Sequence, residues 1–186
     1  YPLLKAHAKK YGPMTLIQFD AHCDTWTDDG KRFDHGTMFA RAANEGIIDV
    51  TKSTQIGLRT YNDTDYGFEI LTSPWVHRNG IHAAIEIALK RAEDTPVYLS
   101  FDIDGLDPAF APGTGTPVCG GLASWQGLEF VRALEPLNLI GMDIVEVSPA
   151  YDTAEITALA AANIAYDWIA LIAKKNGAPC SFVGKI

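Results

Sequence analysis

Two apolar segments, each followed at once by an acidic cluster, constrain this chain more than any other feature. Residues 16–19 (LIQF) lead into Asp20-Ala21-His22-Cys23-Asp24, and residues 97–101 (VYLSF) lead into Asp102-Ile103-Asp104. Side chains two residues apart in an extended backbone project to the same side, so the carboxylates and the imidazole of each cluster can converge. We therefore expect two buried strands whose ends carry the ligands of a divalent metal.

The four carboxylates of these clusters carry a large negative charge. If they lie close together, some of them must take up protons unless cations neutralise them. Two divalent ions balance four carboxylates while His22 stays neutral, and such a pair can ionise water to give the nucleophile of a hydrolase. The alternative is that these aspartates are ordinary turn and cap residues. Their spacing in two clusters, each behind an apolar strand, favours the metal site.

Composition and charge argue against two classes of partner. The net charge is −8 and no basic stripe is visible, whereas a nucleic-acid partner requires one. The mean hydropathy of +0.01 is that of a soluble globular protein. No segment approaches the ~18 continuous apolar residues of a membrane span, so we expect no membrane partner. The acidic balance is compatible with a small cationic substrate.

The length predicts a single domain over residues 1–186, because 186 residues are too few for two comfortable domains. The chain begins with Tyr1 rather than Met, and residues 2–10 read as the remainder of a helix. We therefore expect that an N-terminal part is missing. The three cysteines, Cys23, Cys119 and Cys180, are odd in number and lack CxxC spacing, which indicates a reducing, cytoplasmic setting. Alternation points Cys23 away from its acidic neighbours, toward packing.

Helical and extended patterns alternate along the chain, with short breaks between them. This predicts an α/β fold, a three-layer sandwich in which helices flank a mostly parallel central sheet. Helices are expected over residues 2–11, 37–45, 79–93, 124–134 and 153–175, and strands over residues 14–19, 53–58, 68–71, 97–101 and 139–147. The segment between Asp102 and Gly121 is rich in glycine and proline, and such a long irregular loop is often functional.

In parallel α/β sheets, ligands bind outside the carboxyl ends of the strands. Both acidic clusters are predicted at that edge, and so is Glu146, which follows the last expected strand. Asp143 lies three residues earlier and faces the opposite way by alternation, so we expect a structural role for it.

Three segments resemble signature blocks of the ureohydrolase family, which includes arginase, agmatinase and guanidinobutyrase. They are FDAHCD at residues 19–24, SFDIDGLDP at residues 100–108 and MDIVEVSP at residues 142–149. The similarity runs over nearly the whole chain and is strongest to bacterial agmatinases. It also covers FDHGTMF at residues 33–39, QIGLRT at residues 55–60 and AFAPGTGTP at residues 109–117. The resemblance implies an arginase-like fold.

The resemblance also implies two Mn²⁺ ions in each complete subunit. Asp20 and Asp102 would bridge the ions, Asp24 would complete one site, and His22 with Asp104 would complete the other. The family carries a further histidine ligand in a Gly-Gly-Asp-His block, and no segment of this chain matches that block. One ion would therefore lack its only imidazole, and we expect this chain by itself to bind one metal better than two and to be weakly active or inactive.

The activity implied by the resemblance is hydrolysis of agmatine to putrescine and urea, a step of polyamine biosynthesis. A hydroxide that bridges the two metals would attack the guanidinium carbon. Glu146 matches the carboxylate that orients the guanidinium group, because a carboxylate can accept two parallel N–H bonds from it. His35 matches the family's Asp-His-Gly-Thr block and is the candidate proton shuttle, since imidazole titrates near neutrality. Without the resemblance, His35 would read as an exposed loop histidine, and Glu146 as a capping residue.

Other functions remain open at this stage. Guanidinobutyrase or another amidinohydrolase of the family would use the same site on a different tail. Asp102-Ile103-Asp104-Gly105 also resembles the start of haloacid-dehalogenase-type phosphatases, but Leu106 stands where a hydroxyl residue is expected, and the Asp20 cluster would have no role. A non-catalytic metal-binding or assembly fragment is the remaining alternative. The family is oligomeric, so the expected protein partner is a further copy of the chain, in a trimer or hexamer.

Overall fold

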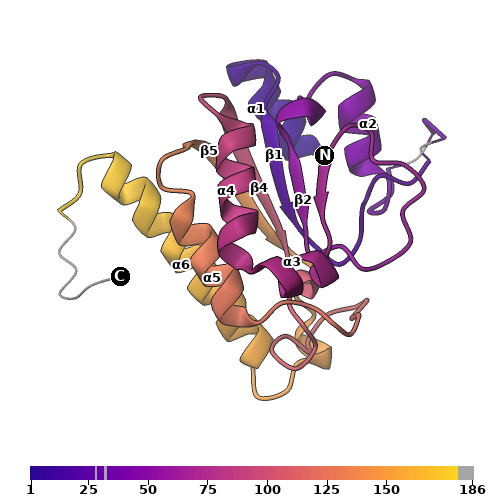
Figure 1. Cartoon of the computed structure of the whole chain (residues 1–186), viewed down its shortest axis with the longest axis vertical. Coiled ribbons are helices and arrows are strands. Elements are labelled where there is room, and N and C mark those ends of the chain that lie inside the picture. Colours follow the sequence, from indigo (N-terminus) through magenta and orange to yellow (C-terminus); the bar gives the residue numbers. More distant parts are fainter. Residues whose placement is uncertain (28, 32, 180–186) are drawn as a thin grey trace.

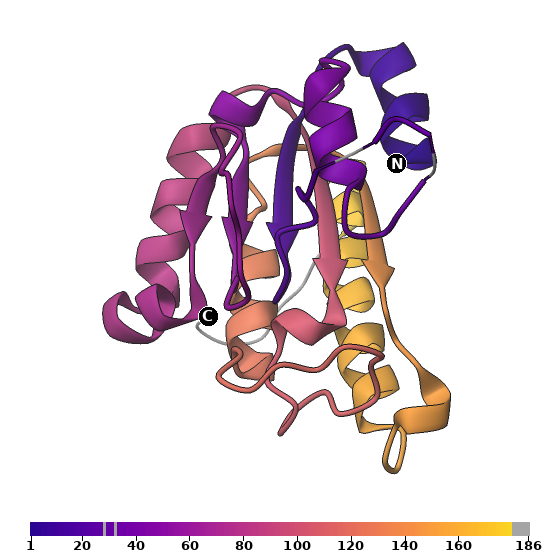
Figure 2. The ribbon, with the colours of Figure 1, turned by 90° about the vertical axis from the view of Figure 1, so that its right-hand side faces the viewer.

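Five parallel strands form one sheet in the order β3-β2-β1-β4-β5. The computed structural model describes residues 1–27, 29–31 and 33–179 (Figure 1). The arrowheads of the strands lie at one end of the sheet in Figure 2, as the predicted α/β fold requires. The strands are β1 (Thr15–Phe19), β2 (Thr54–Ile56), β3 (Glu69–Leu71), β4 (Pro96–Asp102) and β5 (Asn138–Val145).

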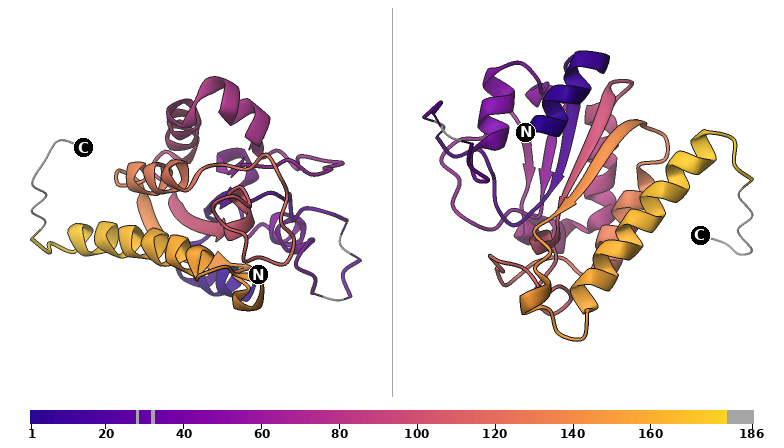
Figure 3. Two further views of the ribbon diagram at one scale, coloured as in Figure 1. Left: turned by 90° about the horizontal axis from the view of Figure 1, so that it is seen from below. Right: turned by 180° about the vertical axis from the view of Figure 1, so that it is seen from behind.

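Helices cover both faces of this sheet and give the three-layer sandwich predicted from the sequence. One apolar core joins the sheet to α3 (Ser73–Asn79), α4 (Ile81–Ala92), α5 (Ser124–Ala133) and α6 (Ile156–Lys175). A second core on the other face joins it to α1 (Pro2–Tyr11) and α2 (Met38–Asn44). Figure 3 shows α6 running beside β5. Because both faces are covered, β1 and β4 are buried along nearly their whole length.

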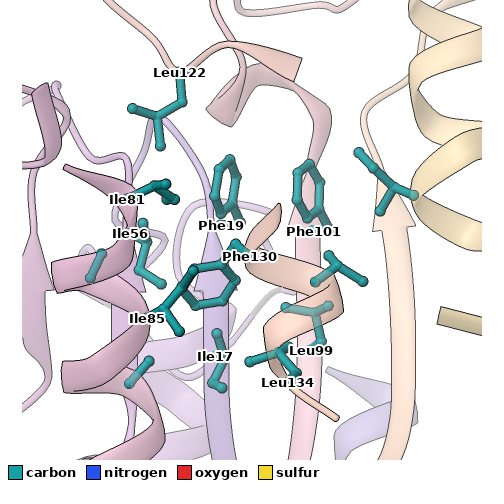
Figure 4. Packing of buried hydrophobic residues seen from close by; sticks show 14 of the residues in the cluster. Ile17, Phe19, Ile56, Ile81, Ile85, Leu99, Phe101, Leu122, Phe130 and Leu134 are labelled. Atoms are coloured by element: carbon teal, nitrogen blue, oxygen red, sulfur yellow. The ribbon is translucent and has the colours of Figure 1, made fainter. Parts of the chain in front are cut away.

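Aromatic rings fill the core directly beneath the carboxyl ends of β1 and β4. The rings of Phe19 and Phe101 are stacked with their centroids 4.4 Å apart, and the ring of Phe130 from α5 lies 6.1 Å from that of Phe19 (Figure 4). All three side chains are fully buried. Since Asp20 and Asp102 are the next residues after the stacked pair, the ends of these two strands have a close-packed support.

Two helix boundaries differ from the sequence prediction. The helix expected over residues 79–93 begins only at Ile81, because Gly80 takes a φ of 88° and separates it from α3, a short helix that periodicity did not indicate. Pro74 in the first turn and the Thr72 hydroxyl, which accepts a hydrogen bond from the Trp75 amide, begin that helix.

The second difference lies at the start of the last helix. The expected helix from residue 153 begins at Ile156, because Ala154 and Glu155 both adopt left-handed backbone conformations. Asp152 still serves this end, since its carboxylate accepts hydrogen bonds from the backbone amides of Thr157 and Ala158.

By length and composition α6 could cross a membrane, and it is the one such helix in the described part of the chain. Its sequence is interrupted by Asn163 and Asp167, and its inner side contributes Ile164 and Trp168 to the core of the protein. Asp167 pairs with Arg132 of α5 at 2.8 Å. We therefore describe α6 as a partly buried core helix.

Candidate metal centre

The pairing of β1 with β4 brings the two acidic clusters together. Phe19 and Phe101 are register partners, so Asp20 and Asp102 continue two neighbouring strands at the same edge of the sheet. After β4 the chain turns into a short 3₁₀ helix, η2 (Ile103–Gly105), which the Asp102 carboxylate caps. The Asp104 amide donates to Asp102 Oδ1 at 2.9 Å. This turn carries Asp104 back toward the end of β1.

Asp20, His22 and Asp104 form one compact group of potential ligands, with one ligand atom of each residue within 4.8 Å of the others. The His22 Nδ1 atom lies 3.0 Å from Asp104 Oδ2 and 3.5 Å from Asp20 Oδ1. The backbone also joins the clusters, because the Ala21 amide donates to Asp104 Oδ1 at 3.0 Å. Asp20 and Asp104 are buried, and His22 is partly exposed, which leaves the group open on one side.

Electrostatic coupling within this group is strong. The carboxylates of Asp104 and Asp20 accept hydrogen bonds from His22 and raise the pKa of its imidazole to about 10. Burial works against ionisation of Asp104, but the hydrogen bonds from His22 and the Ala21 amide leave the pKa of this carboxyl below its ordinary value. The imidazolium of His22 thus stands where a cation is needed.

Asp24 and Asp102 lie outside the compact group but within electrostatic reach of it. Burial raises the pKa of both carboxyls, and the negative charge of Asp20 raises each of them further. Burial also raises the pKa of Asp20, to about 6. Three carboxyls that resist ionisation for lack of positive charge are the arrangement that bound divalent cations would relieve. The donor set of carboxylates and one imidazole fits Mn²⁺ or a similar first-row ion.

A buried pair of glutamines supports Asp20, and sequence reasoning assigned no role to either. The Gln18 amide donates to Asp20 Oδ2 at 2.7 Å, and Gln55 on the neighbouring strand donates to Gln18 Oε1 at 2.5 Å. Gln55 also donates to the carbonyl of Cys23 at 2.6 Å. The sequence signal for this network was one glutamine within each of the two apolar strands, Gln18 in β1 and Gln55 in β2. Buried side-chain amides require hydrogen-bond partners.

The loop between β4 and α5 closes over the group from the other side. Its Thr116 hydroxyl donates to Asp104 Oδ2 at 3.1 Å. The carboxylate of Asp107 accepts hydrogen bonds from the amides of Gly120 and Gly121, which folds the loop back on itself. This is the irregular glycine- and proline-rich segment that the sequence marked as functional.

Glu146 follows β5 and stands on the same edge of the sheet. Its φ of 66° is a left-handed conformation that is uncommon for a residue with a side chain, and such strain is typical of functional positions. The loop reaches it, because Thr114 and Val147 form an antiparallel bridge and the Ser148 amide donates to the Gly113 carbonyl at 2.7 Å. The charge of Glu146 contributes to the raised pKa of Asp24. Glu146 is exposed and follows β5 at the edge where the acidic clusters lie.

Asp143 has the structural surroundings that alternation predicted. The hydroxyls of Tyr98 and Ser100 on β4 donate to its two carboxylate oxygens at 2.9 Å and 2.7 Å. Burial raises the pKa of Tyr98, and the neighbouring Asp143 charge adds to this shift. These contacts tie β5 to β4 on the face away from Glu146.

His35 is not a member of the compact group. His35 is exposed and lines a cavity with Tyr1, Phe33, Met38 and Arg41, and within the described residues no contact joins its ring to the acidic side chains. Its segment is nevertheless tied to the first cluster through the backbone. The Phe39 amide donates to the Asp24 carbonyl at 3.1 Å, and the Trp26 amide donates to the Gly36 carbonyl at 3.0 Å.

Neither cysteine that the structure describes belongs to this group. Cys23 is fully buried, which confirms the packing role predicted from alternation, and Cys119 is exposed on the loop before α5. Neither forms a disulfide. Cys180 lies outside the described residues.

Comparisons with known proteins agree with this geometry. Residues 1–170 match the model of the arginase family. An agmatinase of Chromobacterium violaceum is 56% identical over 178 residues, which cover 95% of this chain and 55% of that protein. The crystal structure of a hypothetical agmatinase from Burkholderia thailandensis superposes with a TM-score of 0.93 at 55% identity, over 95% of this chain and 56% of that one.

A more distant relative has the same fold. The proclavaminate amidino hydrolase of Streptomyces clavuligerus superposes with a TM-score of 0.88 at 37% identity, and the match covers 92% of this chain and 60% of that one. The chain thus spans between half and two thirds of the length of these relatives. The family match covers nearly all of the sequence and coincides with the Asp20, His22 and Asp104 group. The chain belongs to the arginase family.

Proposed function

We propose that the protein hydrolyses the guanidinium group of agmatine and releases putrescine and urea, as part of polyamine biosynthesis. The observation that carries this proposal is the convergence of Asp20, His22 and Asp104 at the ends of two neighbouring strands. Relatives named agmatinase that are 54–56% identical to the chain support the choice of substrate.

Two Mn²⁺ ions would be held by five side chains of this chain. In this proposal Asp20 and Asp102 would contribute to both sites, Asp24 would contribute to one, and His22 with Asp104 would contribute to the other. When bound, the ions would supply hydroxide near neutral pH by lowering the pKa of water. The raised pKa values of Asp20, Asp24 and Asp102 support this assignment, because these carboxyls need positive charge beside them to ionise.

Glu146 is proposed to bind and orient the substrate. A guanidinium group keeps its proton at every physiological pH and arrives as a cation. The Glu146 carboxylate can accept two parallel N–H bonds from it, which fixes the plane of the group and the position of its carbon. The left-handed backbone conformation of Glu146 costs free energy. The bridge between Thr114 and Val147 can hold the backbone in this conformation.

His35 is proposed to carry the proton that the departing amine requires. It is exposed and borders a cavity, so it can exchange protons with solvent. Its segment is fixed to Asp24 through the Phe39 amide, which links the position of His35 to the metal centre. The protein partner is proposed to be a further copy of the chain, and the setting cytoplasmic.

The test is urea release by the intact protein after loading with defined divalent metals. Agmatine, arginine, guanidinobutyrate and guanidine are compared, and agmatine should give the highest kcat/KM. Asp20→Asn should abolish urea release, while Asp167→Asn on α6 is the matched control and should retain it. Urea from guanidinobutyrate but not agmatine would move the assignment to another amidinohydrolase of the family. Hydrolysis of an aryl phosphate alone would refute the proposal.

A further inference from the structure

Arg59 follows β2 and holds the backbone around the metal centre. Within the described part of the chain, its guanidinium group donates six hydrogen bonds, all to backbone carbonyl oxygens and none to a side chain. The shortest of them, at 2.6 Å, runs from Nη2 to the carbonyl of Asp104 itself. The acceptors are the carbonyls of Gly57, Asp104, Gly105, Leu106 and Val118.

These carbonyls belong to three different segments. Gly57 directly follows β2, residues 104–106 lie in the turn after β4, and Val118 lies in the loop between β4 and α5. A single planar group with five donors in a fixed fork can join three segments at once. Arg59 therefore fixes the turn that carries Asp104 against the strand beside β1.

The space around the guanidinium group is closely fitted. A Cβ atom on Gly121 would stand 2.6 Å from Arg59 Nη2 and 2.5 Å from the Asp107 amide nitrogen. Gly57, at a φ of +95°, brings the end of β2 so close to β1 that a Cβ there would stand 3.0 Å from the Asp20 carbonyl. Glycine is needed at both positions, because the backbone approaches Arg59 or the first cluster directly.

Arg59 forms no ion pair with a described residue. Among the residues that the structure describes, no carboxylate oxygen lies within ion-pair distance of its guanidinium group. Burial lowers the pKa of Arg59, and the carboxylates of Asp104, Asp107 and Asp20 act in the opposite direction. An arginine that only neutralised a carboxylate would contact it, so the contacts to carbonyls point to a geometric role.

We infer that Arg59 is a positioning residue for the metal centre. By holding the Asp104 carbonyl and its two following neighbours, it sets the direction of the Asp104 carboxylate, which meets His22 Nδ1 at 3.0 Å and the Ala21 amide at 3.0 Å. Arg59 touches none of the proposed ligand atoms. Its effect on activity rests on the proposed function, but its effect on metal affinity does not.

The chain offers a matched control in Arg91. This arginine of α4 also donates to backbone carbonyls, those of Ser53, Val50 and Gly67, at the opposite end of the sheet. Replacing either arginine by lysine keeps the charge and removes the planar fork. Arg59→Lys and Arg91→Lys should therefore both lower thermal stability, whereas only Arg59→Lys should change metal binding.

The experiment is calorimetric titration of the metal-free intact protein with Mn²⁺. Arg59→Lys should raise the Mn²⁺ dissociation constant by about 10- to 100-fold, as the loss of outer-shell support does at other metal sites, and Arg91→Lys should leave it unchanged. At saturating Mn²⁺, Arg59→Lys should lower kcat and leave KM for agmatine unchanged. Wild-type Mn²⁺ affinity in folded Arg59→Lys would overturn the inference, and so would an equal loss in Arg91→Lys.

If Arg59→Lys does not fold, the same titration is carried out on Gly121→Ala, in which the added methyl group must displace the guanidinium group and the backbone at Asp107 while Arg59 is kept. Unchanged Mn²⁺ affinity in that variant would equally overturn the inference. The proposed function has a separate readout. An intact protein that releases no urea from agmatine, yet loses Mn²⁺ affinity on Arg59→Lys, would refute the function and support the role of Arg59.

Discussion

The His22 Nδ1 atom lies 3.0 Å from Asp104 Oδ2, although the two residues follow different strands and belong to different acidic clusters. This contact is the point at which the two clusters become one site. In the metal-free chain it joins an imidazolium to a carboxylate. When a metal binds, the imidazole must give up its proton, so metal binding and proton release are coupled.

The pH dependence of stability should therefore have opposite signs with and without metal. The pKa values of His22, Asp24 and Asp102 are raised in the folded metal-free chain, from 6.5 for the imidazole and 3.8 for the carboxyls. The folded state then binds more protons than the unfolded state above these ordinary values. The stability that these three residues contribute is present at low pH and is lost as the pH rises through their raised pKa values, which for His22 is about 10.

In EDTA, the midpoint temperature of thermal unfolding should therefore decrease as the pH is raised from about 5 to about 8. With saturating Mn²⁺ the midpoint should rise over the same range, because protons compete with the ions. Asp24→Asn cannot take up a proton and should show a shallower fall in EDTA. A metal-free midpoint that rises with pH, with the same slope in Asp24→Asn, would contradict the assignment of these raised pKa values.

The 186-residue chain should bind one Mn²⁺ ion more tightly than a second. Three ligand atoms already stand together in the Asp20, His22 and Asp104 group, whereas Asp24 and Asp102 lie outside it and bring no imidazole. Each missing ligand lowers metal affinity strongly. Calorimetric titration of this chain with Mn²⁺ measures the stoichiometry. Two equally tight ions would show the prediction to be wrong.

Replacing Gln18 should lower the affinity for Mn²⁺ and not only the stability of the core. Gln18→Met keeps the volume of the side chain and removes the N–H group that donates to Asp20 Oδ2 at 2.7 Å. We expect Mn²⁺ affinity to fall by about 10- to 100-fold, in line with other outer-shell substitutions. Equilibrium dialysis with Mn²⁺ measures this. Gln126→Met on α5, another buried glutamine, is the control and should leave the affinity intact.

Thr157 should contribute to the stability of the loop beside Glu146. Its buried hydroxyl accepts a hydrogen bond from the Gly113 amide at 2.7 Å, and Gly113 is the residue whose carbonyl holds Ser148. Thr157→Val leaves that buried amide without a partner, which should cost about 1–3 kcal/mol in the free energy of unfolding. Thr157→Ser keeps the acceptor and should lose less. Urea denaturation of both variants tests this, and equal stability of the two would count against the hydrogen bond.

The sequence predicted those parts of the site that local spacing determines. Asp20 and Asp102 could be placed because an acidic residue directly after a buried strand in a parallel sheet must lie at its carboxyl edge. Glu146 was found by the same reasoning. The roles of Gln18 and Arg59 could not be found in this way, because both depend on which strands are neighbours. Pattern alone does not specify that β1 lies between β2 and β4.

The boundaries that differed from prediction have a common physical cause. Gly80 with its positive φ, and the left-handed pair Ala154 and Glu155, set where α4 and α6 begin. Backbone conformations of this kind respond to tertiary contacts, such as the close approach of Gly113 to Asp152. Apolar periodicity does not detect them.

The strand order has a consequence for how the chain acquires its chemistry during synthesis. β1, β2 and β3 emerge first and can pair with one another, but β1 keeps one flank open until β4 arrives from beyond two helices. Long-range parallel pairing of this kind is slow. The docking of β4 is also the event that delivers Asp104 to His22, so the Asp20, His22 and Asp104 group can assemble only after β4 has paired with β1, while β5 and α6 are still to follow.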